Sequence, residues 1–190
     1  MAEPMTGEES AAAVIDVLEA ESVPYMLVGS LATNYYGIPR ATQDADFVVH
    51  LEKTSISAVA QRLGPRFRLD PQQSFELATG TTRYALQLVG TPFQVELFLL
   101  SDDDHDQTRF SRRRRVQVLD RQAFVPALED VIITKLRWSH HGARPKDLED
   151  ARNVIAVQGD RIDWHYVQAW CDRHGTRQIL EELRRSIPPA

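Results

Sequence analysis

The chain has 190 residues, of which 43% are hydrophobic and 26% charged, and its net charge is −5 at pH 7. This composition predicts one globular domain, or one domain with a modest appendage, and excludes a disordered chain. No apolar run approaches the roughly 18 residues that a membrane helix needs, and the acidic start MAEPMTGEES has no signal-peptide pattern. The single cysteine, Cys171, excludes an intrachain disulfide and fits a reducing compartment, so we expect a cytoplasmic protein.

The first hundred residues predict helices and strands in alternation. Apolar residues at helical spacing indicate a first helix over residues 8–22, which Pro24 ends. Gly90-Thr91 predicts a tight turn between two strands of a hairpin. The remaining segments, in chain order, are a strand at 25–28, a short helix at 30–36, a strand at 44–51, a helix at 54–63, and strands at 66–69, 75–79, 83–89 and 92–100.

The character of the chain changes to helices alone from Pro126 onward. Before that point, SDDDHD (101–106) predicts an acidic loop or the start of a helix, and two short strands follow at 113–119 and 122–126. The predicted helices after it cover 127–138, 146–157, 163–175 and 176–187. We therefore predict an α+β fold, with a small mixed β-sheet flanked by helices in residues 1–125 and a C-terminal helical region, 126–190, packed on it.

Two aspartates begin the strand predicted at 44–51. Asp44 and Asp46 project to the same face because strand side chains alternate with period two, and Glu96 is a third carboxylate within an otherwise apolar strand. Unpaired carboxylates at such positions are costly, and a divalent cation with oxygen ligands, such as Mg²⁺, would stabilise them. The alternative is structural: Asp44 caps the strand, Asp46 pairs with an arginine, and Glu96 points outward from an edge.

Gly29-Ser30 follows the strand at 25–28 and begins the next predicted helix. Glycine lets a backbone approach a ligand closely, and a helix that begins here would direct free N–H groups and the Ser30 hydroxyl at a phosphate. The alternative is a simple turn from strand to helix. Arg40, on a loop stiffened by Pro39, either contacts nucleotide phosphates or forms a salt bridge to Asp44 or Asp46.

The segment VGSLATNYYGIPRATQDADFVV resembles the signature of the nucleotidyltransferase superfamily, in which a glycine-serine turn is followed by two acidic residues one position apart. The spacing of its glycines, arginine, threonine and aspartates is similar to the AbiEii and MenT-like branch of minimal nucleotidyltransferases, whose members are mostly toxins or resistance proteins. The segments PALEDVIITKLRW and RPKDLEDARNVI are similar to the helical region of that branch. The resemblance covers most of residues 25–50 and 125–155.

The resemblance implies a nucleotidyltransferase-like fold and a nucleotidyltransferase activity that depends on Mg²⁺ or Mn²⁺. It assigns metal binding and catalysis to Asp44, Asp46 and Glu96, where Glu96 stands in place of a more usual aspartate and acts as ligand and base. The nucleotide, ATP or another NTP, is expected to contact the glycine-serine turn and several polar residues, with one acidic residue in support: Gly29, Ser30, Arg40, Thr42, Lys135 and, as the supporting residue, Asp147.

The acceptor of the nucleotide is left open between an RNA end such as that of tRNA, a protein, and a small molecule. Residues 1–110 carry 7 basic and 16 acidic side chains, whereas residues 111–190 carry 15 basic and 11 acidic ones, which favours RNA weakly. A toxin-like enzyme would also have an antitoxin-like protein partner. The alternatives to an enzyme are a catalytically degenerate nucleotidyltransferase-fold module that binds or regulates, and an interaction domain unrelated to nucleotides.

Overall fold

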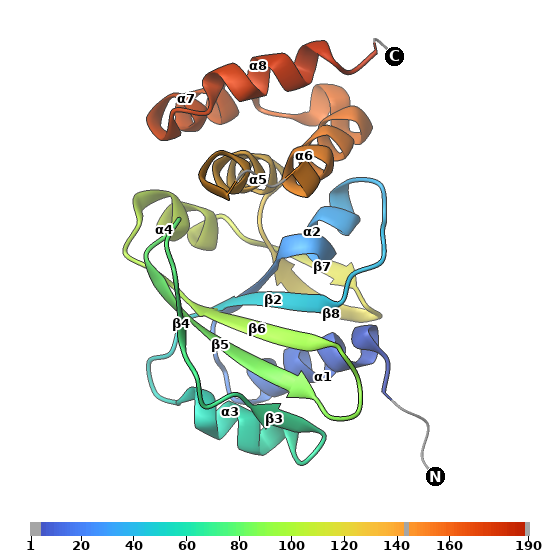
Figure 1. Cartoon of the computed structure of the whole chain (residues 1–190), viewed down its shortest axis with the longest axis vertical. Helices are drawn as coiled ribbons and strands as arrows, with labels where there is room; N and C mark the ends of the chain where they lie inside the picture. The colour runs from blue at the N-terminus through green and yellow to red at the C-terminus, as the bar shows by residue number, and fades with distance from the viewer. Residues whose placement is uncertain (1–4, 143–144, 189–190) are drawn as a thin grey trace.

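A mixed β-sheet separates two layers of helices in the computed structural model, which describes residues 5–142 and 145–188 (Figure 1). Residues 1–4, 143–144 and 189–190, which include part of the acidic start and Arg144 of the RPKDLED segment, lie outside the described residues. The elements are α1 (Gly7–Ala20), β1 (Tyr25–Val28), α2 (Gly29–Tyr36), β2 (Asp44–Val49), α3 (Ile56–Leu63), β3 (Phe67–Leu69), β4 (Ser74–Glu76), β5 (Thr81–Leu88), β6 (Gln94–Leu99), α4 (Asp104–Ser111), β7 (Arg114–Val118), β8 (Arg121–Val125), α5 (Leu128–Gly142), α6 (Pro145–Gln158), a 3₁₀ turn (Gly159–Arg161), α7 (Trp164–His174) and α8 (Arg177–Arg185). The predicted α+β class is confirmed.

The main sheet has the strand order β1-β2-β6-β5-β3, and β4 also pairs with β5. β2 and β6 are parallel, while the other pairs are antiparallel. The register aligns Val28, Asp46, Glu96 and Ala85 across four neighbouring strands. Paired residues on neighbouring strands point to the same face, so this row determines which side chains meet above the sheet.

The two faces of the sheet differ in how apolar they are. α1 and α3 cover the lower face in Figure 1, and Phe47, Leu86 and Leu97 are fully buried in the main apolar cluster. On the opposite face, Met26, Val28, Val48 and Phe98 form a smaller apolar cluster with Phe110 of α4. The carboxylates at the start of β2 lie on this second face, beneath α2 and α5.

The limits of the helices follow from local side-chain chemistry. Thr6 caps α1, where its hydroxyl accepts from the Glu9 amide (3.1 Å) and the Glu9 carboxylate accepts from the Thr6 amide (2.7 Å), a capping box. Ser55 caps α3 by accepting from the Ala58 amide at 3.2 Å.

Two local expectations are decided by acidic side chains. The segment 101–106 begins a helix, α4, because the Asp103 carboxylate caps the amides of His105 and Asp106. The strand predicted over 75–79 is wrong beyond Glu76. There the Glu76 carboxylate accepts from the Ala78 amide at 2.6 Å and the Thr79 amide at 2.9 Å, and these bonds turn the chain out of the sheet.

The C-terminal helices stack above the site. α5 packs against α6 and α7, and α6 also packs against α2. The Tyr36 hydroxyl donates to the Pro126 carbonyl (2.9 Å), which joins α2 to the chain just before α5. The division into residues 1–125 and 126–190 falls between β8 and α5 and stays a prediction. Within the described residues, no helix has the length and apolar character needed to cross a membrane.

Candidate active site

Gly29 is the residue on which the geometry of the site depends. It follows β1 directly and has a φ of +62°, a conformation that residues with side chains rarely adopt. A Cβ at this position would lie 1.9 Å from Oδ2 of Asp46 and 2.8 Å from its Cγ. The backbone at the start of α2 therefore lies directly against the Asp46 carboxylate, and only glycine permits that approach.

Three carboxylates share one face of the sheet beside this turn. Asp44 and Asp46 are two residues apart on β2, and Glu96 is the register partner of Asp46 on β6. Both relations place the side chains on the same face. The sequence predicted the first relation from the period of two; the second depends on strand pairing.

Asp46 is electrostatically strained. Burial, the charges of Asp44 and Glu96 and a hydrogen bond with Glu96 together raise the pKa of Asp46 to about 7, although the Lys135 ammonium acts in the opposite direction. The buried carboxyl group therefore holds its proton to a higher pH than an ordinary aspartate does. A cation bound to the same oxygens would replace that proton, so the donor chemistry fits a divalent metal ion.

The outer two carboxylates have protein partners. The Thr42 hydroxyl donates to Oδ1 of Asp44 at 2.5 Å, and Nη1 of Arg83 donates to Oε1 of Glu96 at 2.9 Å. As the side chains stand, no group of three or more His, Cys, Asp or Glu residues in 5–142 and 145–188 is arranged to hold a metal ion. Metal binding by all three carboxylates would thus require the side chains to rearrange. Thr42, expected at the nucleotide, contacts Asp44.

A buried ionic network lies on the other side of the glycine turn. Arg40 donates from Nε and Nη2 to the two oxygens of Asp150 (2.8 and 2.9 Å) and from Nη2 to the Ser30 hydroxyl (2.9 Å). Lys135 on α5 donates to Asp147 and Asp150, both at 2.8 Å. Arg40 thus forms a salt bridge, although to Asp150 rather than to Asp44 or Asp46. Arg40, Ser30 and Lys135, which are expected to contact phosphates, and Asp147, the expected supporting residue, therefore belong to one cluster.

Asp150 is a member of the site that sequence reasoning missed. Burial acts to raise the pKa of Asp150, but hydrogen bonds from Arg40 and Lys135 hold it below its ordinary value. Asp147 has one carboxylate oxygen, Oδ2, that is buried and has no hydrogen-bond partner. The signal was present in the sequence, because Asp147 and Asp150 are three residues apart on one helix and therefore share a face.

Two cavities meet at the aspartates. The glycine-side cavity, about 380 Å³, is lined by Gly29, Ser30, Lys135, Lys146 and Asp147, and the strand-side cavity, about 410 Å³, by residues 74–78, Arg83, Glu96 and Phe98. Asp44, Asp46 and Trp138 line both. The glycine turn and the two aspartates therefore line one cavity. An interaction domain unrelated to nucleotides would not need these residues to lie together.

Comparison with known proteins identifies the fold. No protein-family model matches the sequence, and no curated protein is significantly similar to it. Among solved structures, the antibiotic-resistance factor ANT(2'')-Ia in solution superposes with a TM-score of 0.62 at 13% identity, covering 96% of this chain and 98% of that one. A putative nucleotidyltransferase from H. pylori superposes with a TM-score of 0.58 at 16% identity, covering 96% of this chain and 80% of that one.

The chain has a nucleotidyltransferase fold. A crystal structure of ANT(2'')-Ia in complex with adenylyl-2''-tobramycin is also similar, with a TM-score of 0.60 at 12% identity over 90% of this chain and 98% of that one. At these identities the likeness concerns the fold. The predicted nucleotidyltransferase-like fold is confirmed, whereas membership of the superfamily and of the AbiEii and MenT-like branch stays a prediction.

Proposed function

We propose that this protein is a Mg²⁺-dependent nucleotidyltransferase, acting in the cytoplasm, that transfers a nucleoside monophosphate from an NTP to a hydroxyl or phosphate group of an acceptor. The observation that carries the proposal is the contact of the Gly29 backbone with Asp46, beside Asp44 and Glu96 on one face of the sheet. A glycine turn at a helix start binds phosphates, and carboxylates beside it bind the metal that accompanies them.

The two cavities give the substrates separate places. In the proposal, the triphosphate lies in the glycine-side cavity, where Ser30, Lys135 and Lys146 provide donors and positive charge. Asp44, Asp46 and Glu96 hold Mg²⁺, or Mn²⁺, at the border of the two cavities. When bound, the ion neutralises phosphate charge and lowers the barrier to displacement. The acceptor enters from the strand-side cavity.

The reaction balances as a displacement at the α-phosphorus. The acceptor oxygen forms a bond to this atom, the bond from the α-phosphorus to the oxygen that bridges to the β-phosphate breaks, and pyrophosphate leaves with the bonding electrons. Glu96 has the role of base for a hydroxyl acceptor, and its carboxylate takes the hydroxyl proton. Arg83 donates to Oε1 of Glu96, so the other carboxylate oxygen, Oε2, takes the proton.

The proposal leaves three classes of acceptor open. The tobramycin adduct in the ANT(2'')-Ia complex is a property of that protein, and it supports a small-molecule acceptor as one candidate here beside an RNA end and a protein side chain. A place in the AbiEii and MenT-like branch would add a toxin-like role and an antitoxin-like partner.

Transfer of label from NTP tests the function. The protein is incubated with each of the four NTPs labelled at the α-phosphate, Mg²⁺, and either total RNA or a cell lysate. We expect label in one acceptor fraction, lost on addition of a chelator and in Asp46→Asn. Absence of transfer with every nucleotide, or equal transfer by Asp46→Asn, contradicts the proposal.

A second candidate is a nucleotidyltransferase-fold module that binds without turnover. It is favoured by one feature, the ion pair between Arg83 and Glu96, which occupies one oxygen of the expected base. Calorimetry and the label assay together distinguish the two candidates. The binding module would bind Mg²⁺-NTP in calorimetry but would transfer no label, even when Arg83→Met frees Glu96.

A further inference from the structure

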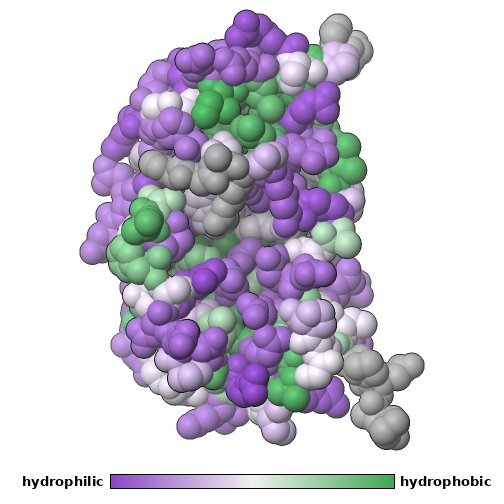
Figure 2. Space-filling model, viewed as in Figure 1, coloured by the Kyte–Doolittle hydropathy of each residue, from purple (hydrophilic) through white to green (hydrophobic). Residues whose placement is uncertain are grey.

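The strand-side cavity has an unusually apolar outer wall. Phe75 and Leu77 are 64% and 86% exposed, the highest values among the large hydrophobic residues described, and both line this cavity. Phe98 and Trp138, whose rings lie 6.3 Å apart, form the inner wall. Figure 2 shows an apolar patch at the left edge of the molecule, level with the β4–β5 loop in Figure 1. Exposed apolar side chains that face a cavity indicate a binding surface.

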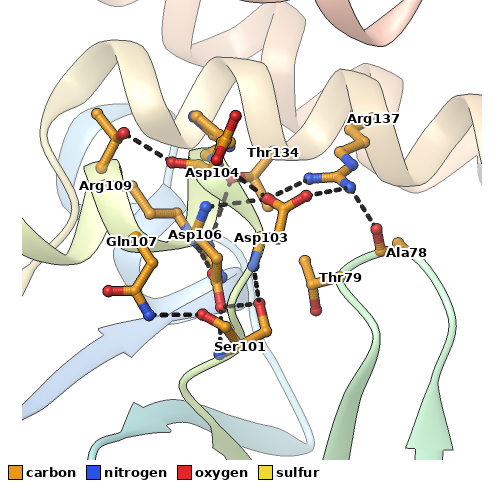
Figure 3. A network of polar contacts seen from close by, with 12 residues as sticks. Ala78, Thr79, Ser101, Asp103, Asp104, Asp106, Gln107, Arg109, Thr134 and Arg137 are labelled. Carbon is orange, nitrogen blue, oxygen red and sulfur yellow. Dashed lines mark hydrogen bonds and ion pairs between the residues drawn. The ribbon is translucent and has the colours of Figure 1, made fainter.

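The outer wall is held in place by hydrogen bonds. The Glu76 carboxylate accepts from the amides of Ala78 and Thr79 and from the Thr79 hydroxyl at 2.6 to 2.9 Å. From α5, Arg137 donates to the Ala78 carbonyl and forms a two-point ion pair with Asp103 at 2.8 and 2.9 Å (Figure 3). The backbone that carries the wall is therefore preorganised, which lowers the cost of ordering it when a ligand binds.

The charges around this cavity exclude a polyanion. Among the residues that line it, Arg83 is the only basic one described, and it donates Nε to Ser74 (2.7 Å) and Nη1 to Glu96 (2.9 Å). The other charged groups are the carboxylates of Asp44, Asp46, Glu76 and Glu96. A nucleic acid needs lysine or arginine side chains for its phosphates, and this lining offers none that is uncommitted.

We infer that the strand-side cavity is the acceptor site for a hydroxyl-bearing small molecule that is neutral or cationic and has an apolar face. This rests on the proposed function, because the cavity opens onto the aspartates expected to hold the metal. The apolar face packs between Phe75 and Leu77 on one side and Phe98 and Trp138 on the other, and the hydroxyl points to the aspartates. The volume of about 410 Å³ is that of a small-molecule site.

Binding of three matched compounds tests the inference without requiring turnover. Phenylethanolamine carries a ring, a hydroxyl and a positive charge; ethanolamine lacks the ring, and mandelate exchanges the positive charge for a negative one. Ligand-observed NMR titrations are run on the full chain with Mg²⁺ and a non-hydrolysable NTP analogue. We expect phenylethanolamine to bind roughly tenfold more tightly than either of the others, as the burial of one ring and the sign of the charge require.

Variants of the wall locate the binding. Phe75→Ser combined with Leu77→Ser alters two exposed side chains, so the fold is retained, and it should abolish the preference for phenylethanolamine over ethanolamine. Val89→Ser is the matched control, since Val89 is 57% exposed but lies on the β5–β6 turn outside this cavity. Unaltered binding of the NTP analogue in both variants shows that the nucleotide side is intact.

Several results would overturn the inference while leaving nucleotide transfer untouched. Equal affinity for mandelate, equal affinity for ethanolamine, or full binding by the Phe75→Ser, Leu77→Ser variant each contradicts it. So does transfer of nucleotide to total RNA that depends on Asp46 and is insensitive to the two wall substitutions. Failure of the proposed function would be seen instead as an absence of any transfer in the label assay.

Discussion

Replacing Gly29 by alanine isolates the contact from which the site is built. The new Cβ would lie 1.9 Å from Oδ2 of Asp46, and since real Cβ atoms stay at least 3.0 Å from such neighbours, the carboxylate must move by about 1 Å. An alanine at this positive φ is also strained, which lowers the free energy of unfolding by roughly 1–2 kcal/mol. A displacement of about 1 Å at a catalytic group costs roughly a hundredfold in rate.

Gly175→Ala is the matched control for Gly29→Ala. Gly175 also has a positive φ, +69°, at the end of α7, but nothing lies within 4 Å of the position of its Cβ. Chemical denaturation and transfer of α-labelled nucleotide are measured for both variants. We expect similar backbone strain in both and the roughly hundredfold loss of transfer in Gly29→Ala alone. Equal transfer by Gly29→Ala and the parent would refute the reasoning about Asp46.

Three further predictions concern charged and titratable side chains. Arg83→Met removes the cation that competes for Glu96, so the Mg²⁺ concentration that supports half-maximal transfer should fall several-fold. Asp150→Asn leaves the buried Lys135 and the partly exposed Arg40 without their shared partner and should lower the free energy of unfolding by roughly 3 kcal/mol, measured by denaturation. Burial lowers the pKa of His174 to about 4, so the unfolded chain binds more protons between about pH 6.5 and 4, and stability is lost as the pH falls through that window. His174→Gln should flatten this dependence in thermal melts, while the exposed His165→Gln should leave it unchanged.

Each of these predictions has a contradicting result. An unchanged or higher Mg²⁺ requirement in Arg83→Met would mean that Glu96 does not contribute to metal binding. Loss of less than about 1 kcal/mol in Asp150→Asn would show that the network is loosely held. A pH profile of His174→Gln that coincides with the parent would assign the acid sensitivity to other groups.

The local part of the fold could be predicted because it depends on neighbouring residues. The period of two placed Asp44 and Asp46 on one face, and the glycine-serine turn marked where α2 begins. The helix predicted over 54–63 is α3, which Ser55 caps and Gly64 ends. In each case the deciding interaction lies within a few residues of chain, so the sequence pattern contains it.

The rest of the site depends on pairings between distant segments. Arg40 was expected either at phosphates or paired with the aspartates nearest in the chain, whereas its partner Asp150 lies 110 residues away. Glu96 lies beside Asp46 only because β2 and β6 pair in parallel. Arg137 reaches the Ala78 carbonyl only because α5 packs above the β4–β5 loop. Periodicity within one segment carries no information about such partners.

The most direct test of the central claim compares NTP labelled at the α-phosphate with NTP labelled at the γ-phosphate in the presence of Mg²⁺. If the protein transfers a nucleoside monophosphate, the α-label is incorporated into an acceptor, the γ-label leaves as pyrophosphate, and Asp46→Asn abolishes both events. Incorporation of the γ-label, or its release as inorganic phosphate without incorporation of the α-label, would contradict the assignment of the site.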